Sequence, residues 1–97
     1  MKKEINLEWD EEKRQCNIDL RGVDFKDAVD IFSDPNMQLY LDNRHDYGEM
    51  RFNAYGMSKN RHLRVCFTLR DNIIRIITMF KVHEKEWNQQ YKTFISE

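Results

Sequence analysis

The sequence predicts an α+β fold, in which two helices precede a four-stranded antiparallel sheet and a third helix follows it, in the order β-α-α-β-β-β-β-α. Apolar residues recur at helical spacing near both ends of the chain. Between residues 37 and 80 they alternate instead, which is the period of strands. The segments between these strands are too short for parallel crossovers, so we expect hairpins and antiparallel pairing.

The first helix is expected just after a short strand at residues 7–9. Asp10 suits the N-cap, because its side chain can accept hydrogen bonds from the free amides of a helix that runs from Glu11 to about Leu20. Gly22 suits the C-terminal end, because glycine readily adopts the left-handed conformation that closes many helices. The sequence therefore predicts a helix between these two residues.

A second helix is expected after Asp24, which is another suitable N-cap. It should end at Ser33, because Pro35 pushes the residue before it out of the helical conformation. We expect one apolar stripe of this helix to face the core, formed by Phe25, Ala28, Val29 and Phe32.

Polar turns divide the alternating segment into four strands. Residues 42–48, 58–61 and 70–72 are rich in polar side chains and are expected to form these turns. The last strand is the most apolar and should lie inside the sheet. The expected strands are Met37–Leu41, Glu49–Met57, Leu63–Leu69 and Ile73–Phe80.

The last helix is expected to run from about Glu84 to Ser96. Its apolar residues are spaced so that they fall on one side of the helix, and this side should therefore pack on the sheet. These residues are Trp87, Tyr91, Phe94 and Ile95.

Length and composition predict one folded domain that spans residues 1–97. Hydrophobic residues make up 40% of the chain, which is enough for one core. Cys16 and Cys66 lack C-x-x-C spacing, so we expect two buried free thiols. The N-terminus carries acids where a signal peptide needs an apolar run, and no segment is long and apolar enough to span a membrane. We therefore expect a cytoplasmic protein without membrane contact.

Charge is distributed unevenly along the chain, although the net charge is only −1. Residues 1–43 hold six Lys or Arg and eleven Asp or Glu, whereas residues 44–83 hold eight and three. The basic half suits a polyanion. A charge pattern that only keeps a monomer in solution is an equally good reading.

Familiar catalytic motifs do not occur in the sequence. It has no glycine-rich phosphate loop, no recognisable Ser-His-Asp arrangement, no HExxH motif and no paired-cysteine site. His45, His62 and His83 are scattered, so we interpret them as surface residues and expect neither a metal nor another cofactor.

Guanidinium groups are concentrated on the predicted strands. One strand carries Glu49 and Arg51 on the same face, and Arg64, Arg70 and Arg75 follow. Guanidinium forms paired hydrogen bonds to phosphate oxygens, which suits a phosphate that gains charge while RNA is cut by its own 2′-hydroxyl. A surface ion pair without function is the alternative reading.

Arg75 interrupts the most apolar strand, where an unpaired charge would be unfavourable. It therefore needs a phosphate or an acid from the N-terminal half, such as Asp34. Unpaired bases could in addition stack on tyrosines, although the last of the four also fits the core stripe of the final helix. The tyrosines are Tyr40, Tyr47, Tyr55 and Tyr91.

Short motifs follow one another along the chain in a recognisable order. They begin with Leu-Glu-Trp-Asp at residues 7–10 and continue at Lys13, Asn17, residues 22–28, 32–35, 48–51, Gly56, residues 68–70, 75–78, Glu86 and Tyr91. In this order and spacing the chain resembles the BrnT family of ribonuclease toxins from bacterial toxin–antitoxin pairs.

The resemblance implies a fold related to the RelE-type ribonucleases, RNA cleavage without a metal, and inhibition of translation. It also implies an antitoxin of the ribbon-helix-helix type, with a heterotetramer as one assembly. Operator DNA would be bound only through this antitoxin, for which the acidic helical half is a suitable docking place.

The positions that match the family pattern predict the catalytic residues. For catalysis we expect the arginines to contact the scissile phosphate, together with a lysine, while the glutamate acts as base or positions the neighbouring arginine. The catalytic residues are Glu49, Arg51, Arg70, Arg75 and Lys81, and the expected RNA contacts are Arg21, Tyr55, Lys59, Arg61 and Arg64.

Two departures from the family pattern leave a second reading open. Leu20-Arg21 stands where the family commonly has Lys-His, and Phe80 stands where it commonly has Arg. Arg21 keeps a positive charge but cannot transfer a proton near neutral pH. The alternative is therefore a non-catalytic relative that binds the antitoxin or RNA.

Overall fold

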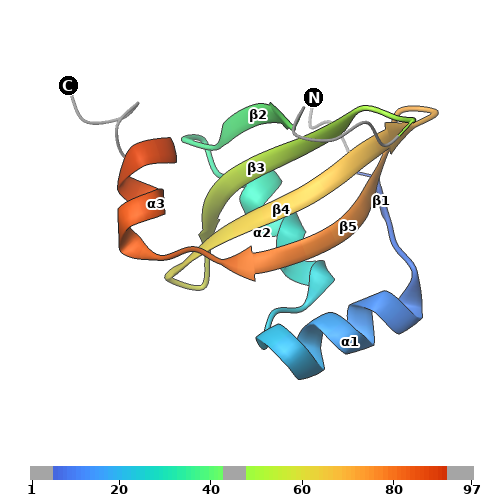
Figure 1. Ribbon diagram of the computed structural model, residues 1–97, viewed down its shortest axis with the longest axis horizontal. Coiled ribbons are helices and arrows are strands. Elements are labelled where there is room, and N and C mark those ends of the chain that lie inside the picture. Colours follow the sequence, from blue (N-terminus) through green and yellow to red (C-terminus); the bar gives the residue numbers. More distant parts are fainter. Residues whose placement is uncertain (1–5, 43–47, 92–97) are drawn as a thin grey trace.

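A computed structural model describes residues 6–42 and 48–91 of the chain. The chain forms a five-stranded mixed sheet with the strand order β1-β5-β4-β3-β2 (Figure 1). The strands are β1 (Leu7–Glu8), β2 (Gln38–Asp42), β3 (Arg51–Ser58), β4 (Arg61–Arg70) and β5 (Ile73–Lys81).

The α+β class and the order of elements are confirmed, but the predicted sheet of four antiparallel strands is wrong. β1 joins as a fifth strand, parallel to β5, with Leu7 opposite Ile74 and Glu8 opposite Arg75. The sequence indicates this strand but not its partner, because the connection between the two includes most of the chain.

Two tight turns join the central strands at the predicted positions. Lys59 and Asn60 link β3 to β4, and Asp71 and Asn72 link β4 to β5. All four residues have positive φ angles between 51° and 66°. Consecutive residues of this kind match the right-handed twist of a hairpin, which is why Asn and Asp are common there.

Helix α1 (Glu11–Arg21) has the predicted ends. The Asp10 carboxylate accepts hydrogen bonds from the amides of Glu12 and Lys13, and Gly22 closes the helix at φ 70°. Cys16 is exposed on this helix, so the prediction that both thiols are buried is wrong for it and right for Cys66. α1 buries only Asn17 against its neighbours, which leaves Cys16 at the surface.

The second predicted helix divides into two parts. Asp24 caps a 3₁₀ turn, η1 (Phe25–Asp27), and α2 (Ala28–Ser33) follows it. A 3₁₀ turn has three residues per turn instead of 3.6, so it changes which residues face the core. As a result Val29 is exposed and Ile31 is buried, in contrast to the predicted stripe.

Helix α3 (Glu84–Gln90) begins where it was predicted. Trp87 and the residue after the helix, Tyr91, are buried and stack with ring centroids 3.9 Å apart. The predicted remainder of the helix, with Phe94 and Ile95, lies outside the described residues.

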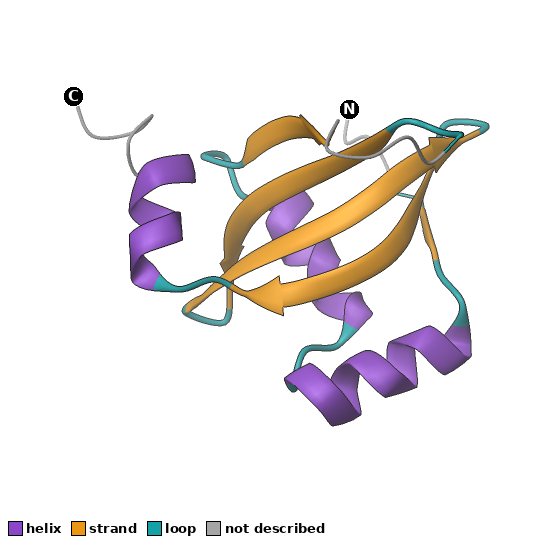
Figure 2. Cartoon of the chain, viewed as in Figure 1, coloured by secondary structure: helices purple, strands orange, loops and turns teal. Residues whose placement is uncertain are grey.

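The two faces of the sheet differ. α2 covers one face, behind the sheet in Figure 2, and Ile31 packs there among residues such as Ala54, Val65 and Ile76. α2 packs mainly on β3 and to a smaller extent on β4, and Leu39 and Leu41 of β2 remain half-exposed. The opposite face carries polar and charged side chains, except at the end where α3 covers it and Tyr55, Trp87 and Tyr91 form a second apolar cluster. We call it the open face.

No helix among residues 6–42 and 48–91 is long and apolar enough to cross a membrane.

Candidate functional site

A row of polar and charged residues crosses all five strands on the open face. The strand register places Asp42 opposite Arg51, Arg51 opposite Thr68, Thr68 opposite Arg75, and Arg75 opposite Glu8. Paired residues share one face of a sheet. Because neighbouring strands are about 4.8 Å apart, Arg51 and Arg75 lie roughly 10 Å apart across Thr68. We call these five residues the charged row.

Glu49, just before β3, connects two of the predicted catalytic arginines. Its Oε2 lies 3.6 Å from Nε of Arg51, and its Oε1 accepts a hydrogen bond of 3.2 Å from Arg70. The Glu49 and Arg51 side chains are each less than one-third exposed. The structure therefore brings three of the predicted catalytic residues together at one end of the charged row.

Arg75 has a carboxylate partner from the N-terminal half, but it is not the predicted Asp34. Its guanidinium group lies 3.5 Å from the Glu8 carboxylate on the neighbouring strand. Asp34 instead accepts hydrogen bonds from the Met57 amide and the Tyr91 hydroxyl. No local pattern predicts the pairing with Glu8, since it depends on where β1 joins the sheet.

The Tyr91 hydroxyl holds its proton tightly in this setting. Burial has the largest effect and the hydrogen bond to the Asp34 carboxylate adds to it, and together they raise the pKa of Tyr91 to about 12. This tyrosine is therefore a neutral structural contact at physiological pH, in agreement with its predicted place in the core stripe.

A second set of cationic side chains lies on the open face, apart from the charged row. Arg64 pairs across the strands with Phe80 and forms an ion pair of 3.0 Å with Glu86. The guanidinium group of Arg21, from the end of α1, also lies over the Phe80 ring. Two of the predicted RNA contacts, Arg21 and Arg64, are thus brought together.

Tyr55 is buried, which does not favour its predicted role as a platform for a base. Its side chain is only 5% exposed, and it packs with Trp87 and Tyr91. Its hydroxyl donates a 2.6 Å hydrogen bond to Glu86. Burial is the largest cause of its raised pKa, and the hydrogen bond to Glu86 is the next. The alternating pattern could not show that α3 covers this residue.

Three other predicted residues lie apart from the charged row. Lys59 and Arg61 both form ion pairs with Asp27, at the turn between β3 and β4. Lys81 is six residues from Arg75 along β5, a distance of roughly 20 Å, and extends near Gly22. The structure therefore separates these three cations from Glu49 and its arginines.

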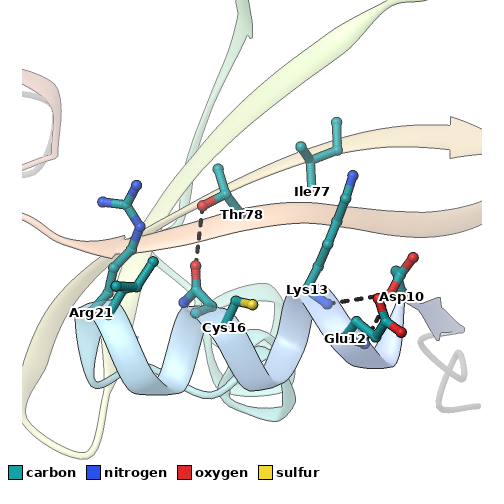
Figure 3. A pocket seen from close by; sticks show the side chains of 9 residues that line it. Asp10, Glu12, Lys13, Cys16, Arg21, Ile77 and Thr78 are labelled. Carbon is teal, nitrogen blue, oxygen red and sulfur yellow. Dashed lines mark hydrogen bonds between the residues drawn. The ribbon is translucent and has the colours of Figure 1, made fainter.

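A groove of about 360 Å³ separates α1 from β5, next to Arg21. In Figure 3, Arg21 and Lys13 extend from α1 on either side of Thr78, whose hydroxyl donates a hydrogen bond to Asn17. The exposed side chain of Leu20 lines the same groove. Position 20 thus lies beside the open face.

A smaller hollow of about 210 Å³ lies between the charged row and Arg64. Its lining combines aromatic rings with hydrogen-bonding groups. It is formed by Tyr40, Leu41, Asp42, Asn53, Tyr55, Arg64 and Gln90.

Within the described parts of the chain, no three His, Cys, Asp or Glu side chains come together in a way that could hold a metal. His62 stacks on Trp87, with ring centroids 4.2 Å apart, and His83 is exposed before α3. His45 and Tyr47 lie outside the described residues. Neither described histidine lies on the charged row.

Comparison with known families gives one match and supports the resemblance of the motifs. A family model described as the ribonuclease toxin BrnT of type II toxin–antitoxin systems matches residues 9–86. This span includes α1, α2 and the strands β2 to β5. No curated protein sequence matches the chain. Because the match covers well over half of the sequence, the chain belongs to the BrnT family of ribonuclease toxins of type II toxin–antitoxin systems.

Proposed function

We propose that this protein is an endoribonuclease that cleaves RNA without a metal ion, and that it does so on the open face. The observation that carries the proposal is the cluster of guanidinium groups around Glu49 and the charged row. Arg51 and Arg70 contact Glu49, and Arg75 lies on the same face across Thr68. This arrangement offers a carboxylate and several phosphate-binding groups within the reach of one nucleotide.

The chemistry that suits these groups is attack by the 2′-hydroxyl of RNA on the adjacent phosphorus. Glu49 accepts the 2′-hydroxyl proton, the new O2′–P bond forms, and the P–O5′ bond breaks while the leaving oxygen takes a proton from solvent. Arg51 and Arg75 donate hydrogen bonds to the phosphate oxygens, which gain negative charge in the transition state. Lys81 is too distant to belong to this set.

The acids around the arginines do not prevent phosphate from binding. The carboxylates of Glu8 and Glu49 lie 3.2–3.6 Å from their arginines, and all these side chains are partly exposed. Such ion pairs contribute at most about 1 kcal/mol. A phosphate that binds two guanidinium groups at once can therefore displace them.

A non-catalytic RNA-binding relative is the second candidate, and one observation favours it. Among residues 6–42 and 48–91, the two histidines lie away from Glu49. A dedicated donor for the leaving oxygen is thus missing from the described part of the site. RNA would still bind to the guanidinium groups.

For the partner we propose an antitoxin of the ribbon-helix-helix type, which would carry the operator DNA contact. Membership of a type II toxin–antitoxin family supports an antitoxin partner in general. The first turn of α1 supports a docking place with acidic side chains, since it carries Glu11 and Glu12. Co-purification with the antitoxin, and its loss in a charge-reversed α1, would test this.

The decisive experiment is cleavage of a purified single-stranded RNA in the presence of EDTA. The native chain would be compared with Glu49→Gln and Arg75→Gln, and with Lys26→Gln on the exposed part of η1, which has the same charge change as Arg75→Gln. We expect cleavage by the native chain and the control, and at least a hundredfold loss in both variants.

The other outcomes are also informative. Salt-dependent RNA binding without any cleavage would favour the non-catalytic candidate. Unchanged cleavage by both variants would show that the reaction takes place elsewhere.

A further inference from the structure

Two guanidinium groups meet over one aromatic ring on the open face. The guanidinium carbon of Arg21 lies 4.2 Å from the centroid of the Phe80 ring, and that of Arg64 lies 4.6 Å from it. The two carbons are therefore at most 8.8 Å apart, because the distances cannot exceed their sum. Arg21 ends α1 and Arg64 belongs to β4, so only the folded chain brings them together.

Like charges at this distance repel each other, so the fold must supply a compensating attraction. The face of an aromatic ring attracts a cation within about 6 Å of its centroid, and both guanidinium groups satisfy this condition at Phe80. Arg64 has a second support in Glu86. Arg21 makes no side-chain hydrogen bond or ion pair with any described residue, which leaves the Phe80 ring as its anchor.

The pair retains a net positive charge and unused hydrogen-bond donors. The Glu86 carboxylate pairs with Arg64 and compensates one of the two positive charges. In addition, the buried Nε of Arg64 has no hydrogen-bond partner in the described structure. Buried donors without partners are uncommon in folded proteins.

We propose that Phe80 is a positioning residue, which holds Arg21 and Arg64 together as a two-cation site for the backbone phosphates of bound RNA. The inference rests on the proposed function, since it assigns a second contact to the same substrate along the same face. Phe80 itself does not contact the reacting atoms. The uncharged Phe80 ring therefore keeps positive charge at this place on the open face by holding its two arginine neighbours.

The test is equilibrium binding of a fluorescent single-stranded RNA whose 2′-hydroxyls are methylated, so that attack by the 2′-oxygen cannot cleave it. Phe80→Leu keeps an apolar side chain but removes the ring face, whereas Phe80→Tyr keeps the ring. We expect Phe80→Leu to bind about five- to tenfold more weakly and Phe80→Tyr to bind like the native chain. Circular dichroism would check that each variant is folded, and Phe80→Met would replace the leucine variant if it is not.

A double-mutant cycle distinguishes positioning from a general packing effect. If Phe80 acts through the arginines, Phe80→Leu should have no further effect in a chain that already carries Arg21→Gln and Arg64→Gln. That arginine variant should also bind with a salt dependence lower by about 1.4 in the slope of log affinity against log salt, which corresponds to two lost phosphate contacts on a single strand.

The inference would be overturned by native affinity in Phe80→Leu, or by an equal loss of affinity with and without the two arginines. In both cases the proposed function would stand, provided that variants of the charged row still weaken cleavage. Failure of the native chain to bind RNA at all would overturn both proposals.

Discussion

The side-chain amide of Asn17 bonds to the main chain of Met79 in the way that a neighbouring strand would. It donates to the Met79 carbonyl at 3.2 Å and to the Val23 carbonyl at 2.8 Å, while its oxygen lies 3.4 Å from the Met79 amide. β1 pairs with β5 only at Ile74 and Arg75, so this part of the β5 edge would otherwise lack partners. One side chain thus completes the edge of the sheet.

Replacement of Asn17 by leucine should therefore destabilise the protein strongly. The substitution leaves two buried carbonyls without a donor, which is expected to lower the free energy of unfolding by about 3 kcal/mol. Urea denaturation would measure it. Gln15→Leu on the exposed side of the same helix is the control and should change stability by less than about 0.5 kcal/mol. Equal effects of both substitutions would show that Asn17 has no special role at the edge.

Gly56 lies where α2 and β3 are in closest contact. A Cβ atom on Gly56 would be 2.9 Å from Cγ2 of Ile31 and 3.1 Å from its Cα. Gly56→Ala should therefore push α2 away from the sheet and lower stability by about 1–3 kcal/mol. Thermal unfolding would measure the change, with Asn53→Ala on the open face of the same strand as the comparison. A stability equal to that of the native chain would mean that the helix shifts without loss.

Removal of the acid next to Arg75 should strengthen RNA binding. Glu8→Gln abolishes an ion pair of 3.5 Å between partly exposed groups, which contributes at most about 1 kcal/mol to stability. The guanidinium group then meets less competition, and affinity for RNA should rise about two- to fivefold. Glu12→Gln, an equal charge change on α1, distinguishes a local effect from that of net charge. An identical gain in both variants would argue against a phosphate contact at Arg75.

Ionisation of Tyr91 should weaken the fold at alkaline pH. Its pKa is raised from the ordinary 10.0 to about 12, so the folded chain binds this proton more tightly than the unfolded chain does. The corresponding stabilisation is complete below pH 10.0 and is lost as the pH rises through about 12. Tyr91→Phe should remove this part of the alkaline loss, as measured by urea denaturation at several pH values. An unchanged pH profile would assign the loss to other tyrosines.

Local chemistry explains which parts of the fold could be predicted. Asp10 and Gly22 mark the ends of α1, and the Asn60 and Asn72 turns mark the hairpins, because capping and positive φ angles depend on a few adjacent residues. The predicted core-facing stripe of the second helix was wrong, because nothing in the local pattern shows that the turn at Phe25 is 3₁₀.

The contact between Glu49 and Arg51 could be predicted because the two residues are close in sequence. Glu49 and Arg51 are two residues apart, and the structure places them together. The Glu8 partner of Arg75 and the contact of Arg21 with Phe80 depend on distant elements that meet in the fold. The burial of Tyr55 has the same origin, since α3 covers it. Residue types indicated a phosphate site, but its partners depend on the tertiary structure.

The pairing of β1 with β5 determines at which stage of synthesis the charged row can form. Glu8 leaves the ribosome early, and Arg75 follows 67 positions later on the strand that it must join. β4 and β5 also have to emerge before the charged row spans the sheet. A nascent or prematurely ended chain that lacks β5 therefore carries Glu49 and Arg51 but not Arg75 beside Glu8. On the proposed mechanism, a partly synthesised chain would remain harmless to the RNA around it until its last strand has been added.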